Sequence, residues 1–178
     1  EAFNNGNGTS PAPLTLQDYA DAGVTGVNAD NLDAVNAQVL AQATGGANTE
    51  AKVQALVVLA SAALNKIEDY NNGDGTIPSA LTLSDYTAAG VTGVSNANLA
   101  AVNAQVLAAT TGGANSVAEV QALVTAANTA LAKIEAYNNG NGTTPAALTT
   151  QDYAAVGITG VSADNLVAVN AKVLAAAT

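Results

Sequence analysis

Histidine, cysteine, methionine and tryptophan are absent from this chain of 178 residues, which contains one phenylalanine and five tyrosines. Without imidazole and thiol groups there is no histidine base, no thiolate nucleophile and no soft-metal site. Only carboxylates, lysines, tyrosines and hydroxyl groups remain for catalysis, so we expect the protein not to be an enzyme. A chain without cysteine is compatible both with export by a route that needs no disulfides and with the cytoplasm, so cysteine usage does not decide the compartment.

Positive charge is also scarce, with 14 acidic residues against 4 lysines, a net charge of −10 and a pI near 4.1. The lysines form no patch and are scattered at positions 52, 66, 133 and 172. An acidic chain without a basic patch repels a phosphate backbone, so we expect no nucleic-acid partner. The longest apolar stretch, from Ala55 to Leu64 with Ser61 inside it, is too short to span a bilayer, which predicts no membrane insertion.

One segment occurs three times, as GTSPAPLTLQDY from Gly8, GTIPSALTLSDY from Gly75 and GTTPAALTTQDY from Gly142. The offset from the first to the second equals that from the second to the third, which predicts a tandem array in which each copy is one supersecondary unit. We divide the chain into the end of a preceding copy, two whole copies and a truncated third copy, at residues 1–7, 8–74, 75–141 and 142–178. Because both ends fall inside a copy, we expect a fragment of a longer protein.

The sequence of each copy predicts three helices, and the first of them is short. A threonine three residues before an aspartate forms a capping box, and a glycine accepts the left-handed conformation at the helix end. These residues are Thr15, Asp18 and Gly23, then Thr82, Asp85 and Gly90, then Thr149, Asp152 and Gly157.

The second helix is expected to start near an N-cap residue, at Asn28, Ser95 and Ser162. Its apolar residues recur at helical spacing. They are Leu32, Val35, Val39 and Leu40, then Leu99, Val102, Val106 and Leu107, then Leu166, Val169, Val173 and Leu174.

The third helix is long, at about 49–70 and 116–137, and its apolar residues from Val53 to Tyr70 are expected to face one partner surface. Residues 71–82 form the longest link, which contains Pro78, and we expect this link to be the joint between copies; the matching prolines are Pro11 and Pro145. The fold class is therefore all-α, with tandem three-helix, bundle-like repeats of about 67 residues arranged as an elongated rod.

The joint is the one segment that offers oxygen ligands for an ion. Asn72 and Asp74 stand at the third and fifth positions of an EF-hand pattern. Its first and twelfth positions would be Tyr70 and Leu81, so both end carboxylates are missing. Asn-Gly pairs also form turns by themselves. Asn72 and Asp74 are thus weak calcium candidates, and we expect no cofactor and no calcium dependence.

Asp18, Asp85 and Asp152 are each followed by tyrosine, which suggests catalytic carboxylates. No second acid recurs beside them, however, as acid and base catalysis by a carboxylate pair would require. We expect these aspartates to cap helices, and the tyrosines to supply core side chains with their hydroxyls at the edge. The sequence therefore predicts no catalytic residue.

Asn36, Asn103 and Asn170 flank the apolar stripe of the second helix. They could specify register among helices or form a solvated flank, and a hydrogen bond to a loop backbone is the favoured interpretation. The Gly-Gly pairs at 45–46 and 112–113 are followed by no Lys-Ser or Lys-Thr, so we expect turns and no phosphate loop.

The segments LTLQDYADAGVTGV, NLDAVNAQVL, ATGGAN and ALNKIEDYNNGDGT carry a resemblance that covers essentially all 178 residues. In repeat style and composition the chain resembles the helical tandem repeats of very large secreted adhesins of Gram-negative bacteria, of the biofilm-associated and RTX type. The resemblance implies a structural protein at the cell surface, whose repeats extend a binding tip and are often stiffened by calcium. The joints contain too few carboxylate ligands for calcium, which argues against stiffening of this chain by calcium.

Two functions follow as hypotheses. The first is a non-catalytic spacer, or stalk, of a secreted bacterial adhesin that acts in cell adhesion and biofilm formation. Its partners are neighbouring repeats and a second copy of the chain through the truncated repeat. The alternative is a repeated three-helix module that binds a host or matrix protein, where repetition supplies avidity. An exposed aromatic shared by the copies would favour the binding module.

Overall fold

The computed structural model describes residues 2–5, 12–73, 79–140 and 146–176. Every regular element in these ranges is an α-helix, so the all-α prediction is confirmed for the described residues. The helices are α1 (Ala2–Asn5), α2 (Leu16–Asp21), α3 (Leu32–Leu40), α4 (Glu50–Asn72), α5 (Leu83–Ala88), α6 (Leu99–Ala108), α7 (Val117–Asn139), α8 (Thr150–Ala154) and α9 (Leu166–Leu174).

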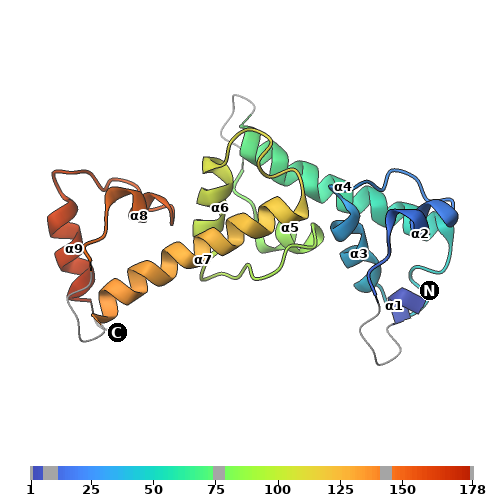
Figure 1. Ribbon diagram of the computed structural model, residues 1–178, viewed down its shortest axis with the longest axis horizontal. Helices are drawn as coiled ribbons and strands as arrows, with labels where there is room; N and C mark the ends of the chain where they lie inside the picture. Colours follow the sequence, from blue (N-terminus) through green and yellow to red (C-terminus); the bar gives the residue numbers. More distant parts are fainter. Residues whose placement is uncertain (1, 6–11, 74–78, 141–145, 177–178) are drawn as a thin grey trace.

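Groups of short helices follow one another along the longest axis, and the long helices α4 and α7 run between them (Figure 1). Helix α4 packs against α3 and also against α5 and α6. Helix α7 in turn packs against α6, α8 and α9. Each long helix therefore packs on the second helix of its own copy and on both short helices of the copy that follows.

The short first helices form as the capping boxes predict. The aspartate carboxylate accepts the backbone N–H of the threonine, at 2.7 Å for Thr15 and at 2.8 Å for Thr82 and Thr149. The glycine after each helix has a positive φ, of 78° at Gly23, 77° at Gly90 and 79° at Gly157. Residue type and spacing thus determine both ends of these helices.

The second helix is confirmed, although its first regular residue comes about one turn after the residues named from the sequence. The structure begins it at Leu32, Leu99 and Leu166, after the N-cap residues Asn31, Asn98 and Asn165. The residues chosen from the sequence instead open a preceding turn, in which the backbone N–H of Asn28 donates to Asn31 Oδ1 at 2.8 Å. The pairing is reciprocal, because Asn28 Oδ1 accepts the backbone N–H of Asn31 at 3.0 Å. The backbone N–H of Leu32 donates to the carbonyl oxygen of Asn28 at 3.0 Å, so the turn leads directly into the helix.

The third helix is confirmed, because α4 and α7 are 23 residues long and begin after the caps Thr49 and Ser116. The expectation of one partner surface is wrong. Helix α4 spans about 34 Å and α3 about 13 Å at 1.5 Å per residue, so no short helix can cover the whole stripe. Gln54 bonds Thr25 of its own copy at 2.9 Å, whereas Lys66 reaches Asp85 of the next copy at 2.6 Å.

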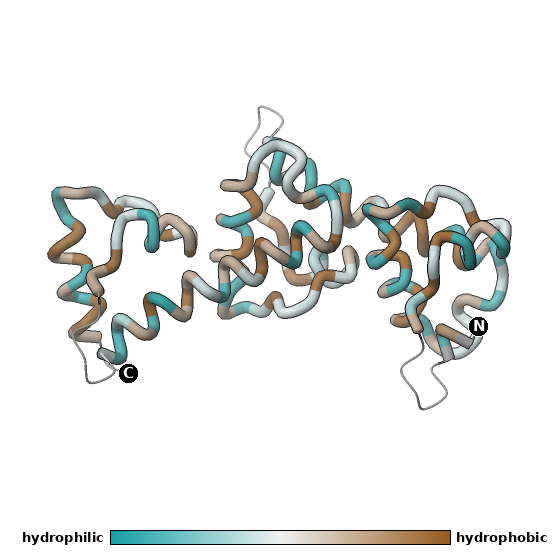
Figure 2. The backbone as a smooth tube through the Cα atoms, viewed as in Figure 1, coloured by the Kyte–Doolittle hydropathy of each residue, from teal (hydrophilic) through white to brown (hydrophobic). Residues whose placement is uncertain are grey.

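Apolar side chains from Phe3 to Val156 form one continuous core, most of which comes from the first two copies. Apolar residues recur along the full length of the long helices, as Figure 2 shows for the backbone. A smaller cluster, built around Tyr137, Leu148 and Tyr153, holds α8 and α9 on the end of α7. The long helices thus carry the hydrophobic contacts from one copy into the next.

Candidate interface between successive copies

Of the two residues proposed as calcium ligands, the structure describes only Asn72. Asn72 lies at the end of α4, and its Oδ1 accepts the backbone N–H of Gly112 at 3.0 Å. Asp74 lies outside the described residues, as do Pro11, Pro78 and Pro145 of the joint. Across the ranges that the structure describes, no three acidic side chains gather as a metal site would require. Independence from calcium stays a prediction.

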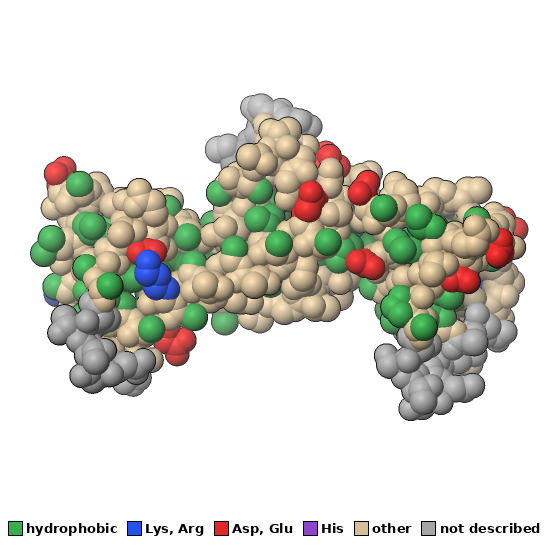
Figure 3. Space-filling model, viewed as in Figure 1, with side chains coloured by type: hydrophobic (Ala, Val, Ile, Leu, Met, Phe, Trp, Pro, Cys, Tyr) green, Lys and Arg blue, Asp and Glu red, His purple; other side chains and the backbone are tan. Residues whose placement is uncertain are grey.

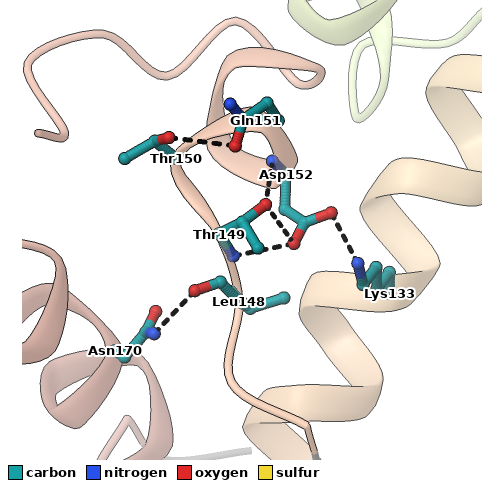
Figure 4. A network of polar contacts seen from close by, with 7 residues as sticks. All are labelled: Lys133, Leu148, Thr149, Thr150, Gln151, Asp152 and Asn170. Carbon is teal, nitrogen blue, oxygen red and sulfur yellow. Dashed lines mark hydrogen bonds and ion pairs between the residues drawn. The ribbon is translucent and has the colours of Figure 1, made fainter. Parts of the chain in front are cut away.

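The aspartates of the capping boxes also connect copies. Lys66 of α4 contacts Asp85 at 2.6 Å, and Lys133 of α7 contacts Asp152 at the same distance. In Figure 4 one carboxylate oxygen of Asp152 faces Thr149 and the other faces Lys133. Each carboxylate therefore caps its own helix and binds the long helix of the copy before it.

These contacts lower the pKa of the aspartates. At Asp152 the hydrogen bonds from Lys133 and from the Thr149 backbone hold the pKa below its usual value. At Asp85 burial favours the neutral form, but the bonds from Lys66 and Thr82 outweigh it and the pKa is again lowered. The ionised form of both groups is thus the one that the folded chain stabilises.

A buried tyrosine and asparagine join the first helix to the second. The hydroxyl of Tyr86 donates to Asn103 Oδ1 at 2.7 Å, and Asn103 Nδ2 donates to the carbonyl oxygen of Leu81 at 2.9 Å. The same tyrosine bond recurs in the copy before and in the copy after, for Tyr19 with Asn36 and for Tyr153 with Asn170. The prediction of an asparagine bond to a loop backbone is confirmed.

The expected position of the tyrosine hydroxyls is wrong. They lie inside the protein and not at its edge, because the asparagine amide provides an acceptor there. Burial raises the pKa of Tyr19 to about 12 and also raises the pKa of Tyr86 and Tyr153. These hydroxyls are structural donors and are poorly suited to act as bases near neutral pH.

A second set of asparagines, to which the sequence assigned no role, closes the carboxyl ends of the second helices. Asn71 Nδ2 donates to the carbonyl oxygens of Val106 at 2.8 Å and Ala109 at 3.1 Å. Asn4 and Asn138 make the equivalent bonds to α3 and α9. They add donors to carbonyl oxygens at the helix end, where backbone partners are few; the carbonyl oxygen of Val106, for example, also accepts the backbone N–H of Ala109 at 3.3 Å. Their recurrence directly after an aromatic residue was the available signal.

Small residues bring the second helix of one copy against the first helix of the next. Gln38 Nε2 donates to the carbonyl oxygen of Ala88 at 2.6 Å. A Cβ atom on Gly90 would lie 2.8 Å from Ala37 Cβ, whereas at Gly23 the nearest atom, in Glu50, would be 3.5 Å away. Gly90 thus adopts the positive φ that ends α5, and its lack of a side chain also lets α3 of the preceding copy pack closely.

The Gly-Gly pairs form turns, as predicted. Gly45 and Gly112 have positive φ, and the N–H groups of Gly46 and Gly113 donate to carbonyl oxygens three residues earlier at 2.8 Å. The described stretches hold no helix that is long and apolar enough for a bilayer. On the face in Figure 3 acidic side chains are scattered, and no dense charged patch marks a ligand site.

No protein-family model matches this chain, and neither a curated protein nor a solved structure matches it. The geometry therefore has to carry the functional argument. It consists of one set of hydrogen bonds, ion pairs and close contacts that is repeated at the same offset and joins each copy to the next.

Proposed function

We propose that the chain is a non-catalytic spacer, made of tandem three-helix repeats of equal length arranged as an elongated rod. The single observation that carries this proposal is the sharing of each long helix between successive copies. A helix that packs on both copies transmits their relative orientation, and a helix of 23 residues separates them by about 34 Å. Repetition of such a unit gives length and stiffness, the two properties that a spacer needs.

Contacts between copies support a fixed geometry. The Lys66 pair with Asp85 and the Gln38 bond to Ala88 recur, at the same distances, as Lys133 with Asp152 and Gln105 with Ala155. Two successive junctions are thus built from the same bonds. Identical junctions apply the same rotation and translation each time, which favours a regular array over a flexible string of domains.

The aromatic residues favour a spacer over a binding module. Binding surfaces are enriched in exposed tyrosine and other aromatics. All five tyrosines and the one phenylalanine are buried in the described part of the chain: Phe3, Tyr19, Tyr70, Tyr86, Tyr137 and Tyr153. No shared aromatic is left on that surface to contact a partner in every copy.

Exposed positions also differ between the copies. The exposed position of Asp33 in α3 carries Ala100 in α6 and Val167 in α9. On the long helices the exposed Val58 and Leu59 are replaced by Thr125 and Ala126. A repeated binding module would keep its contact residues, while a spacer needs only solubility at these positions.

We place this spacer in a bacterial cell-surface adhesin outside the cell, where it would hold a binding tip away from the surface. The alternative is a repeated module for a host or matrix protein. A pull-down with the immobilised 178-residue chain separates the two functions. The spacer predicts that serum and matrix proteins are retained no better than on a blank surface, and saturable retention of one such protein would favour the binding module.

A further inference from the structure

One hydrogen bond between the first two copies bypasses the long helix that they share. Gln38 Nε2 of α3 donates to the carbonyl oxygen of Ala88 at 2.6 Å. Every other hydrogen bond that the structure describes between these copies involves a side chain of α4. The next junction repeats the pattern, because Gln105 Nε2 donates to Ala155 at 2.6 Å and the remaining described bonds involve α7. The glutamine therefore makes the direct contact between the short helices of successive copies.

Close packing surrounds this bond. A Cβ atom on Gly90 would lie 2.8 Å from Ala37 Cβ and 3.2 Å from Ala34 Cα, so α3 rests directly on the backbone that follows α5. At the next junction a Cβ atom on Gly157 would lie 3.1 Å from Ala104 Cβ. We call the contact of α3 with residues 88–90, and that of α6 with residues 155–157, the brace.

Glutamine is suited to the brace because it brings a donor to the end of a short helix. Ala88 is the last residue of α5, where carbonyl oxygens have no partner within the helix. In the described part of the chain no backbone N–H outside the helices donates to the carbonyl oxygen of Ala88 or of Ala155. The amide of Gln38 supplies this donor from the preceding copy and holds α3 at one position against α5.

The brace lies away from the axis of the shared helix. Packed helices have their axes about 8–10 Å apart, so a contact between α3 and the end of α5 opposes rotation of the two copies about α4. Elsewhere at this junction the copies leave a cavity of about 390 Å³, which is lined by Asn28 and Asp30 of the first copy and by Asn115 of the second. Packing at that place does not oppose the rotation.

We propose that Gln38 and Gln105 are positioning residues, which act through the brace to fix the rotation between successive copies. The long helices α4 and α7 set the distance between copies, and the brace sets the angle. This inference rests on the proposed spacer function and adds to it the residues that determine the angle. It separates two properties of the array, because loss of the brace should leave the length of each long helix unchanged.

Two spin labels measure the angle in the chain of 178 residues. The sequence contains no cysteine, so Gln17→Cys and Ser84→Cys together give one defined pair of labels. Both positions are exposed, and they are equivalent places on α2 and α5, away from the axis of α4. Double electron–electron resonance then gives the distribution of distances between the labels. We expect a single narrow distribution for the labelled parent.

Two variants remove the bond from the brace. Gln38→Met retains a long side chain without the donor, and Gln38→Glu places a carboxylate against the carbonyl oxygen of Ala88. Both should widen the distribution about twofold, because relative motion is expected where no direct contact fixes two units. Gln42→Met is the matched control, since the side chain of Gln42 binds only the backbone of its own copy, and it should leave the width unchanged.

The melting temperature of each variant is recorded as well, because a role limited to stability would lower it without widening the distribution. A narrow distribution that the Gln38 variants leave unchanged would overturn the brace and leave the spacer function intact. Equal widening by Gln42→Met would also overturn the brace. A broad distribution in the parent would overturn both the brace and the fixed geometry of the spacer, whereas a compact parent in which only the Gln38 variants widen the distribution would refute the spacer alone.

Discussion

The hydroxyl of Tyr86 lies 2.7 Å from Oδ1 of Asn103, and both side chains are buried. The tyrosine belongs to α5 and the asparagine to α6, while Asn103 Nδ2 also binds the loop before α5 through Leu81. One pair therefore connects the loop and both short helices of a copy. The pair recurs in the first and third copies, and stability should depend on it.

Tyr86→Phe should lower the free energy of unfolding by about 1–3 kcal/mol, because it leaves Asn103 Oδ1 buried without a donor. Urea unfolding followed by circular dichroism measures the change. Tyr137→Phe is the matched control, since the described residues give its hydroxyl no asparagine partner. Equal losses in the two variants would show that the Tyr86 bond contributes nothing specific.

Gly90→Ala should destabilise the chain more than Gly23→Ala. The two glycines have nearly the same φ, 77° and 78°, so both variants bear a similar backbone strain of about 1–2 kcal/mol. The new Cβ at position 90 would also collide with Ala37 of the preceding copy, which adds about 1–3 kcal/mol of overpacking. Thermal unfolding of both variants tests whether the copies are in contact, and equal melting temperatures would show that they are not.

The sequence alone predicts correctly those helices whose ends depend on residues close by in the chain. Thr82, Asp85 and Gly90 specify a whole short helix, and the structure confirms it. The regular part of α6 begins one turn after Ser95, because Asn98 Oδ1 accepts the backbone N–H of Ser95 and holds a turn in front of the helix, which the residue types alone do not indicate.

Contacts between copies could not be predicted in the same way. The sequence contains Lys66 and Asp85 without any sign that they meet, since their approach depends on how α4 turns into the next copy. The role of Asn71 was missed for the same reason, because its acceptors lie 35 and 38 residues further along the chain. Such contacts follow from packing between copies, which a local pattern does not encode.

Stability should fall as the pH drops below about 4. The folded pKa values of Asp85 and Asp152 are lowered, so the unfolded chain takes up protons first, near its ordinary value of about 4, and acid favours unfolding. Lys66→Met removes one of the stabilising bonds at Asp85. The variant should be less stable than the parent at pH 7, by up to about 1 kcal/mol, and the difference should shrink towards pH 2. A difference that is constant with pH would refute the role of this pair.

Helix α9 should exchange its amide hydrogens faster than α6. Val102 and Val106 of α6 are fully buried, whereas their counterparts Val169 and Val173 are half-buried, with no long helix over them in the described residues. Association with a second copy through this face would instead protect α9. Hydrogen exchange on a monomer confirmed by sedimentation distinguishes these cases, and equal protection of both helices in that monomer would contradict our division into copies.

Small-angle X-ray scattering of the monomer tests the spacer proposal most directly, because a spacer must be long. Copies that are joined end to end through helices of about 34 Å form a rod of roughly 80–100 Å, whose radius of gyration is about 25 Å or more. A chain of this length folded into one compact domain has a radius of gyration of about 16 Å. Our account predicts the larger value, and a radius of gyration near that of the compact domain would mean that the copies fold back on one another, which contradicts it.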